Sequence, residues 1–202
     1  MGNSRLKNSA LNFASGFLGR VLTILLNFIV RTIFIHCLNE AYLSVNGLYS
    51  NILTVLSLAE LGFGSAMVYR MYAPVAVKDY QKTAALLHFY KKIYAVIGAV
   101  IFGLGLCVIP FMDYIIKDKP DVSGLTLYYI LFLINTTISY WFASYKSSVL
   151  YADQKEYIKT NVQNAMSILQ SALQIVLLLI FRKYLLYLLV QLGCNIILNL
   201  YV

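Results

Sequence analysis

Six long apolar stretches, separated by short polar connections, run through this 202-residue chain. A transmembrane helix needs about 17–25 mostly apolar residues, and each stretch is of that order. The stretches cover residues 10–36, 44–69, 93–116, 124–147, 161–181 and 184–202. None of them alternates apolar and polar residues as a barrel strand does, and irregular backbone cannot face lipid. The sequence therefore predicts an all-α integral membrane protein, with one membrane domain over residues 1–202.

The composition excludes a small soluble domain. Hydrophobic residues make up 60% of the chain and charged residues 12%, whereas soluble domains have about 45–50% and 25%. A globule of this size cannot bury so much apolar surface. The net charge of +8 does not indicate nucleic-acid binding, because the basic residues are spread between the apolar stretches. Cys37, Cys107 and Cys194 are isolated in the sequence and indicate no disulfide framework.

The distribution of Lys and Arg predicts the topology, since cytoplasmic loops carry the excess of basic residues. With the N-terminus inside, ten basic residues fall on the cytoplasmic side: Arg5, Lys7, Arg70, Lys78, Lys82, Lys91, Lys92, Lys146, Lys155 and Lys159. The outer side then holds four: Lys117, Lys119, Arg182 and Lys183. The predicted protein is multi-pass, with a cytoplasmic N-terminus and short outer loops.

The longest connection, residues 70–92, carries two boundary signals. Pro74 is expected to break the extension of the second helix, and Asp79 to cap a new helix that leads to the third stretch. The piece after Asp79 is either a short amphipathic helix in the membrane interface or a loop that becomes the third helix early.

The first stretch contains three polar residues on one stripe. Arg20, Asn27 and Arg31 are separated by seven and four residues, so that at about 100° per residue they share one face of a helix. A charge at the bilayer centre costs about 2.5–3.5 kcal/mol even on the mildest scale. Either each arginine snorkels to its own interface, or the stripe faces a hydrated cavity, and the alignment with Asn27 favours the cavity.

Glu60 is an acidic residue inside the predicted second span. An ionisable residue within the membrane is a functional hypothesis by default. Glu60 is expected to form a salt bridge with Arg20 or to titrate as the site of a coupled ion.

Further polar stripes mark the later spans. Gln163, Ser167, Gln170 and Gln174 recur at helical spacing, and we expect Gln163, Gln170 and Gln174 to line the same cavity as the arginines. The neighbouring stripes contain Asn135, Ser139, Gln191, Asn195 and Asn199. For any single residue the alternative is an interhelical hydrogen bond. An interior of guanidinium groups, amides and hydroxyls suits a large polar ligand that carries phosphate, because guanidinium binds phosphate in a bidentate way.

Signatures of enzymes are missing from the sequence. It contains no P-loop, no H-E-x-x-H and no G-x-S-x-G. His36 and His88 lie far apart without further metal-ligand partners nearby. We expect no catalysis, no cofactor and no metal.

Several sequence segments resemble those of bacterial polysaccharide flippases. In the second stretch these are residues 47–53 (Gly-Leu-Tyr-Ser-Asn-Ile-Leu) and 57–66 (Ser-Leu-Ala-Glu-Leu-Gly-Phe-Gly-Ser-Ala). Residues 69–94, with Lys-Asp-Tyr at 78–80, and residues 152–158 (Ala-Asp-Gln-Lys-Glu-Tyr-Ile) are similar to that family as well. The resemblance covers essentially the whole chain but only the N-terminal half of such a protein. The family belongs to the multidrug/oligosaccharidyl-lipid/polysaccharide exporter superfamily.

The resemblance implies one six-transmembrane-helix lobe of a two-lobe exporter fold (6+6 or larger) around a cationic cavity. It implies a transporter in the bacterial cytoplasmic membrane that flips undecaprenyl-diphosphate-linked oligosaccharides for O-antigen, capsule or exopolysaccharide. Arg20 and Arg31 match the family's habit of placing arginines on the first helix. The alternatives are a multidrug exporter of the same fold and a membrane scaffold for glycan-assembly enzymes.

The expected partners follow from this resemblance. They are the lipid bilayer, the lipid-linked oligosaccharide and a second lobe, which is either a missing C-terminal half or a second copy of the chain. Glycan-assembly proteins are further candidates. The sequence ends at Val202 inside an apolar run, which predicts that a C-terminal lobe is missing.

Overall fold

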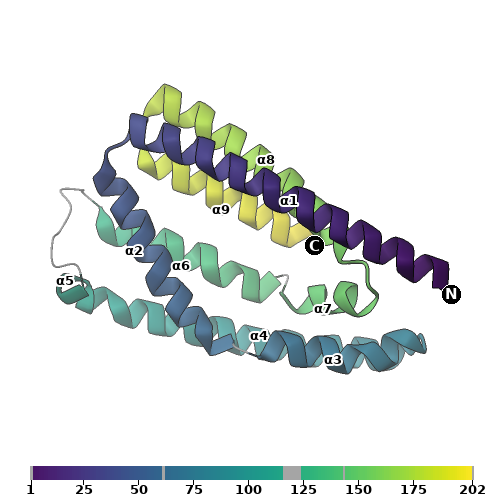
Figure 1. Ribbon diagram of the computed structural model, residues 1–202. Coiled ribbons are helices and arrows are strands. Elements are labelled where there is room, and N and C mark those ends of the chain that lie inside the picture. The colour runs from purple at the N-terminus through teal and green to yellow at the C-terminus, as the bar shows by residue number, and fades with distance from the viewer. Residues whose placement is uncertain (1, 61, 116–123, 143, 202) are drawn as a thin grey trace.

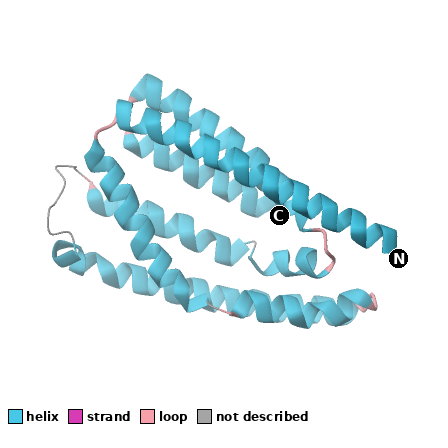
Figure 2. Cartoon of the chain, viewed as in Figure 1, coloured by secondary structure: helices cyan, strands magenta, loops and turns pink. Residues whose placement is uncertain are grey.

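The computed structural model describes residues 2–60, 62–115, 124–142 and 144–201, and within these ranges the chain forms helices joined by short turns (Figure 2). The elements in chain order are α1 (Gly2–Cys37), α2 (Glu40–Ser57), the 3-10 helix η1 (Leu58–Glu60), α3 (Phe63–Ala76), α4 (Tyr80–Val108), the 3-10 helix η2 (Ile109–Phe111), α5 (Met112–Ile115), α6 (Leu125–Phe142), α7 (Ser144–Ala152), α8 (Glu156–Phe181) and α9 (Tyr184–Tyr201). Lys117 and Lys119 of the predicted outer loop lie outside the described residues.

Among the described residues, five helical segments are long and apolar enough to cross a membrane. They are Lys7–Cys37, Tyr80–Phe111, Leu125–Phe142, Glu156–Phe181 and Tyr184–Tyr201. Their outer surfaces carry large apolar side chains, for example Phe13 and Phe28 of α1, which are 74% and 73% exposed. Apolar surface on this scale is covered by lipid or by another protein. The predictions of an all-α fold and of a membrane protein are confirmed in the described part of the chain.

The predicted second span, residues 44–69, is wrong as one continuous helix. The chain forms α2, turns through η1 and starts α3 after Gly62, whose φ is +89°. This left-handed backbone is open to glycine, which has no Cβ to clash with the preceding carbonyl group. α2 has 18 residues and a polar face. The described part of the chain therefore contains five of the six predicted spans, with a broken segment in place of the second.

Of the two boundaries predicted between α3 and α4, the helix cap at Asp79 is confirmed and the helix break at Pro74 is wrong. Asp79 caps α4 as predicted, since its Oδ1 accepts a hydrogen bond of 2.9 Å from the backbone N–H of Lys82. Pro74 lies inside α3, which continues to Ala76. α4 then runs unbroken from Tyr80 to Val108. The third helix therefore begins early, and residues 80–92 are its first turns rather than a separate interfacial helix.

The helices pack as a layered bundle. α1 runs along α8, α8 along α9, α9 along α6 and α6 along α4, while α2 crosses towards α6 and α4 (Figure 1). A first core cluster, which includes Phe34, Tyr49, Leu133 and Tyr184, joins α1, α2, α6 and α9. A second one, which includes Met71 and Tyr140, joins α3, α4 and α6. The polar side chains that remain between α1, α2, α6, α8 and α9 define the candidate site.

Candidate functional site

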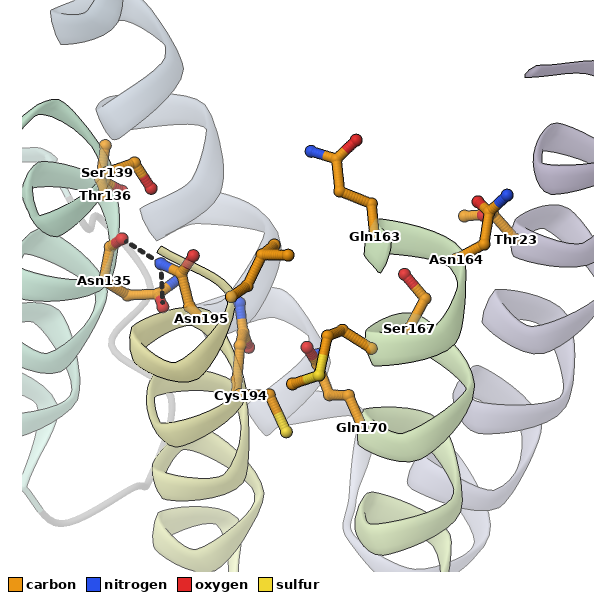
Figure 3. Close-up of a pocket in the computed structure, with 13 residues that line it drawn as sticks. Thr23, Asn135, Thr136, Ser139, Gln163, Asn164, Ser167, Gln170, Cys194 and Asn195 are labelled. Carbon is orange, nitrogen blue, oxygen red and sulfur yellow. Dashed lines mark hydrogen bonds between the residues drawn. The ribbon is translucent and has the colours of Figure 1, made fainter. Parts of the chain in front are cut away.

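A cavity of about 610 Å³ lies between α6, α8 and α9, with α1 at its edge. Amides and hydroxyls dominate its lining, and none of the lining residues carries a formal charge (Figure 3). The lining consists of Thr23, Asn135, Thr136, Ser139, Gln163, Asn164, Met166, Ser167, Gln170, Gln191, Cys194, Asn195 and Leu198. Polar residues within apolar helices of this length face each other or water, because lipid does not solvate them.

A neighbouring cavity of about 290 Å³ extends this space towards α2. The two cavities share Asn135, Thr136 and Gln191. The second one is lined by Ser50, Leu53, Thr54, Ser57, Phe132, Asn135, Thr136 and Gln191. We call the two cavities together the polar groove. The groove thus reaches from the α1–α8 edge to the hydroxyl face of α2.

An amide network forms the wall of the groove between α6 and α9. Asn195 Nδ2 donates hydrogen bonds to the backbone carbonyl of Asn135 at 2.7 Å and to Oδ1 of Asn135 at 3.0 Å. Asn199 Nδ2 donates to Asn195 Oδ1 at 2.7 Å and to Ser139 Oγ at 3.3 Å. Asn195 and Asn199 therefore form interhelical hydrogen bonds, which is the alternative to cavity lining that the sequence left open. They also hold the α6 and α9 sides of the groove in one arrangement.

The stripe on α8 divides between the groove and the core. Gln163, Ser167 and Gln170 line the groove, and Figure 3 shows them on α8 facing the space in front of Asn135 and Asn195. Gln174 does not line it. That side chain is 2% exposed, and its Nε2 donates a hydrogen bond of 3.3 Å to the backbone carbonyl of Tyr187. At Gln174, α9 packs against α8 and covers the polar stripe.

Arg20, Asn27 and Arg31 are exposed residues of α1, beyond the lining of the groove itself. Gly19 marks the packed face of this helix, and Thr23 lies about 40° to one side of it at about 100° per residue. Asn27, Arg20 and Arg31 follow on the same side, about 80–120° from Gly19.

The opposite flank of α1 is apolar and includes Leu18, Leu22 and Ile29. Because Thr23 lines the groove and Leu22 does not, the polar stripe lies on the flank that borders the groove. Arg20, three residues before Thr23, is therefore placed at the margin of the groove, whereas Arg31 lies eight residues after Thr23, about 12 Å farther along the same flank.

Glu60 lies away from the groove, in η1 at the break between α2 and α3. Its Oε1 accepts a hydrogen bond of 2.9 Å from the Tyr94 hydroxyl, and no salt bridge to Arg20 is found within the described ranges. The predicted ion pair with Arg20 is not formed, and ion coupling at Glu60 stays a prediction. Glu60 shares a separate cavity with Lys159. The sequence did not indicate Lys159 as a site residue, because a lysine near the end of a span is expected to mark the cytoplasmic side of the membrane.

The architecture defines a class of protein. Long apolar helices around a polar interior indicate a multi-pass helical membrane protein. Comparison with known proteins finds no match, whether to a family model, to a curated protein or to a solved structure.

Proposed function

We propose that this chain is a lobe of a polysaccharide transporter in the bacterial cytoplasmic membrane. Its cargo would be undecaprenyl-diphosphate-linked oligosaccharide repeat units, destined for O-antigen, capsule or exopolysaccharide. The observation that carries the proposal is the polar groove, an uncharged lining of amides and hydroxyls inside an apolar bundle. Arg20 lies at its margin, and Arg31 lies farther along the same flank of α1.

The chemistry of the groove matches that of the cargo. Sugar hydroxyls both donate and accept hydrogen bonds, and so do the side-chain amides of residues such as Gln163, Gln170 and Gln191. The larger cavity, about 610 Å³, falls within the range of about 300–1,000 Å³ that is usual for ligand sites. The diphosphate would bind the two guanidinium groups, which form strong bidentate contacts with phosphate oxygens. Gln174 takes no part in this binding, because it is buried in the α8–α9 contact.

The proposed architecture adds α2 to the five long apolar helices. With 18 residues, α2 is about 27 Å long, close to the hydrocarbon thickness of about 30 Å. The N-terminus would be cytoplasmic, as the distribution of basic residues favours. A second lobe, from a longer chain or from a second copy, would cover the open side of the groove.

A multidrug exporter of the same fold is the competing function. Exporters of organic cations need acidic and aromatic cavities, because carboxylates and aromatic faces attract cations. The lining of the polar groove contains one aromatic residue, Phe132, and no carboxylate. The groove therefore favours polysaccharide cargo. A non-transporting scaffold for glycan-assembly enzymes would have no use for such an interior.

The test deletes the gene in its host and follows lipid-linked oligosaccharide at the two membrane leaflets. Deletion should trap the intermediate at the cytoplasmic leaflet, and the wild-type gene should restore its export. The double variant Arg20→Ala/Arg31→Ala should fail to restore export, whereas Arg20→Lys/Arg31→Lys should restore part of it. Arg70→Ala removes an exposed arginine of α3, outside the groove, and serves as the matched control.

Two results would overturn this proposal. One is a deletion strain that exports the intermediate normally, in which case co-purification with glycosyltransferases would favour the scaffold. The other is an Arg20→Ala/Arg31→Ala variant that transports like the wild type. Dye efflux in the same strains separates the multidrug alternative, since that function predicts loss of efflux with export of the sugar lipid intact.

A further inference from the structure

A second polar cavity, of about 340 Å³, lies between η1, α3, α4, α7 and α8 and shares no lining residue with the polar groove. Unlike the groove, it is lined by two oppositely charged side chains, Glu60 and Lys159. The full lining is Glu60, Gly64, Ser65, Met67, Val68, Tyr94, Ser147, Ser148, Tyr151 and Lys159. We call it the Glu60–Lys159 cavity.

The two charges do not neutralise each other directly. Glu60 accepts its hydrogen bond from the Tyr94 hydroxyl, and the Lys159 Nζ lies 5.5 Å from the ring centroid of Tyr151. Within the described ranges no salt bridge joins Glu60 to Lys159. A cavity with separate positive and negative groups on its walls is complementary to a ligand that carries both charges, because each partly buried charge gains a partner on binding.

The neighbouring groups leave this arrangement intact. Burial and the nearby Glu156 carboxylate raise the pKa of Tyr151, so its hydroxyl stays protonated at neutral pH. Ser148 Oγ donates a hydrogen bond of 2.7 Å to the backbone carbonyl of Tyr145, and a hydroxyl that donates can still accept. Glu60 and Lys159 are the two charged residues of the lining, and the Glu156 carboxylate lies close to Lys159 outside the lining.

Helix lengths allow both charged residues to reach the same headgroup layer. Glu60 follows the start of α2, Glu40, by 20 residues, which is about 30 Å along a helix. Lys159 precedes the end of α8, Phe181, by 22 residues, which is about 33 Å. Both distances match the hydrocarbon thickness of about 30 Å. With Glu40 and Phe181 at the same membrane face, Glu60 and Lys159 reach the opposite headgroup layer together.

We infer that the Glu60–Lys159 cavity binds a zwitterion with a phosphate and a primary ammonium group, and that the bilayer supplies it as the headgroup of phosphatidylethanolamine. Lys159 would bind the phosphate and Glu60 the ammonium group, which has three N–H donors. The carboxylate disfavours an additional anion, and a choline group offers it no N–H donor. This inference does not rest on the proposed transport function.

The test measures lipid retention by the purified full chain with native mass spectrometry, after exchange into mixed phosphatidylethanolamine, phosphatidylcholine and phosphatidylglycerol. Phosphatidylethanolamine should be retained preferentially. Glu60→Gln and Lys159→Gln should each reduce that retention at least about tenfold, as expected when one partner of a desolvated charge contact is removed. The exchanged pair Glu60→Lys/Lys159→Glu should recover much of it, because both charges are present again. Lys91→Gln, on the exposed face of α4, is the matched control.

The outcomes separate the possible ligands. Equal retention of phosphatidylcholine or phosphatidylglycerol overturns the inference, as does wild-type retention by both single variants. Soluble O-phosphoethanolamine is added as a competitor. Binding of this compound without retention of the lipid would assign the cavity to a soluble zwitterion and overturn the lipid source. Each variant is compared only as a monodisperse protein with the wild-type thermal transition, and the exchanged pair supplies the result if a single variant unfolds.

Discussion

Gly19 of α1 lies directly against the side chain of Asn164 of α8: a Cβ built on Gly19 would be 2.7 Å from Cγ of Asn164. Asn164 Nδ2 in turn donates a hydrogen bond of 3.3 Å to the backbone carbonyl of Ser15. Because Asn164 also lines the polar groove, this contact fixes α1 at the edge of the groove. The orientation of the Arg20, Asn27 and Arg31 stripe depends on it.

The first prediction tests this close approach. Gly19→Ala should destabilise the protein by about 1 kcal/mol, because the added methyl group displaces the Asn164 amide and breaks its hydrogen bond to Ser15. Gly16→Ala on the same helix meets no atom within 4 Å and should gain up to about 1 kcal/mol from helix propensity. Thermal unfolding in detergent measures the difference, and equal stabilities for the two variants would contradict the packing described.

A second contact between α1 and α8 predicts the effect of Asn12→Ala. Asn12 Oδ1 accepts a hydrogen bond of 2.7 Å from the backbone N–H of Tyr157, and its Nδ2 donates to the carbonyl of Gln154 at 3.1 Å. Asn12 therefore caps α8 from another helix, and its loss should cost about 1–2 kcal/mol. Asn161→Ala, at an exposed position of α8, is the control. Thermal unfolding in detergent measures this loss. An Asn12→Ala protein as stable as the wild type would show that the Asn12 contact does not stabilise α8.

The third prediction concerns the α4–α6 contact. A Cβ on Gly105 would lie 2.9 Å from Leu133 Cδ2, whereas one on Gly103 meets nothing within 4 Å. Gly105→Ala should therefore destabilise the bundle by about 1–3 kcal/mol, and Gly103→Ala should leave it unchanged or more stable. Unfolding in detergent again measures both variants. Reversed stabilities would show that the other face of α4 packs on the bundle.

Most of the fold could be predicted from apolar length, but the broken second span could not. Glycine is common in transmembrane helices, so Gly62 and Gly64 give no sign of which one turns left-handed. The turn depends on where α3 packs, which is on α7 and α4. These are contacts between segments distant in the sequence, which local sequence patterns do not reveal.

The site was predictable to the extent that it follows helical spacing. The spacing placed Gln163, Ser167 and Gln170 on one face, and that face lines the groove. It also placed Gln174 there, but the pairing of α8 with α9 buries Gln174 against Tyr187. Contacts between distant segments, such as the shared cavity of Glu60 and Lys159, have no signature in local spacing.

The fourth prediction tests the turn at Gly62. Gly62→Ala should cost about 1–2 kcal/mol, because φ of +89° is strained for a residue with a Cβ. No atom lies within 4 Å of that Cβ, so the cost is conformational. Gly62→Asn should be tolerated better, since Asn visits this region more readily. Gly47→Ala in α2 is the control, and unfolding curves that do not distinguish Gly62→Ala from it would indicate a helical backbone at Gly62.

The water accessibility of Asn27 tests the central claim most directly, which is that the polar stripe of α1 borders a hydrated groove. In a background with Cys37, Cys107 and Cys194 replaced by alanine, Asn27→Cys and Phe28→Cys place thiols at neighbouring depths on different faces of one helix. A membrane-impermeant, water-soluble thiol reagent should label Asn27→Cys and leave Phe28→Cys unlabelled. Labelling of Phe28→Cys alone, or of neither variant, would contradict a hydrated groove at this flank.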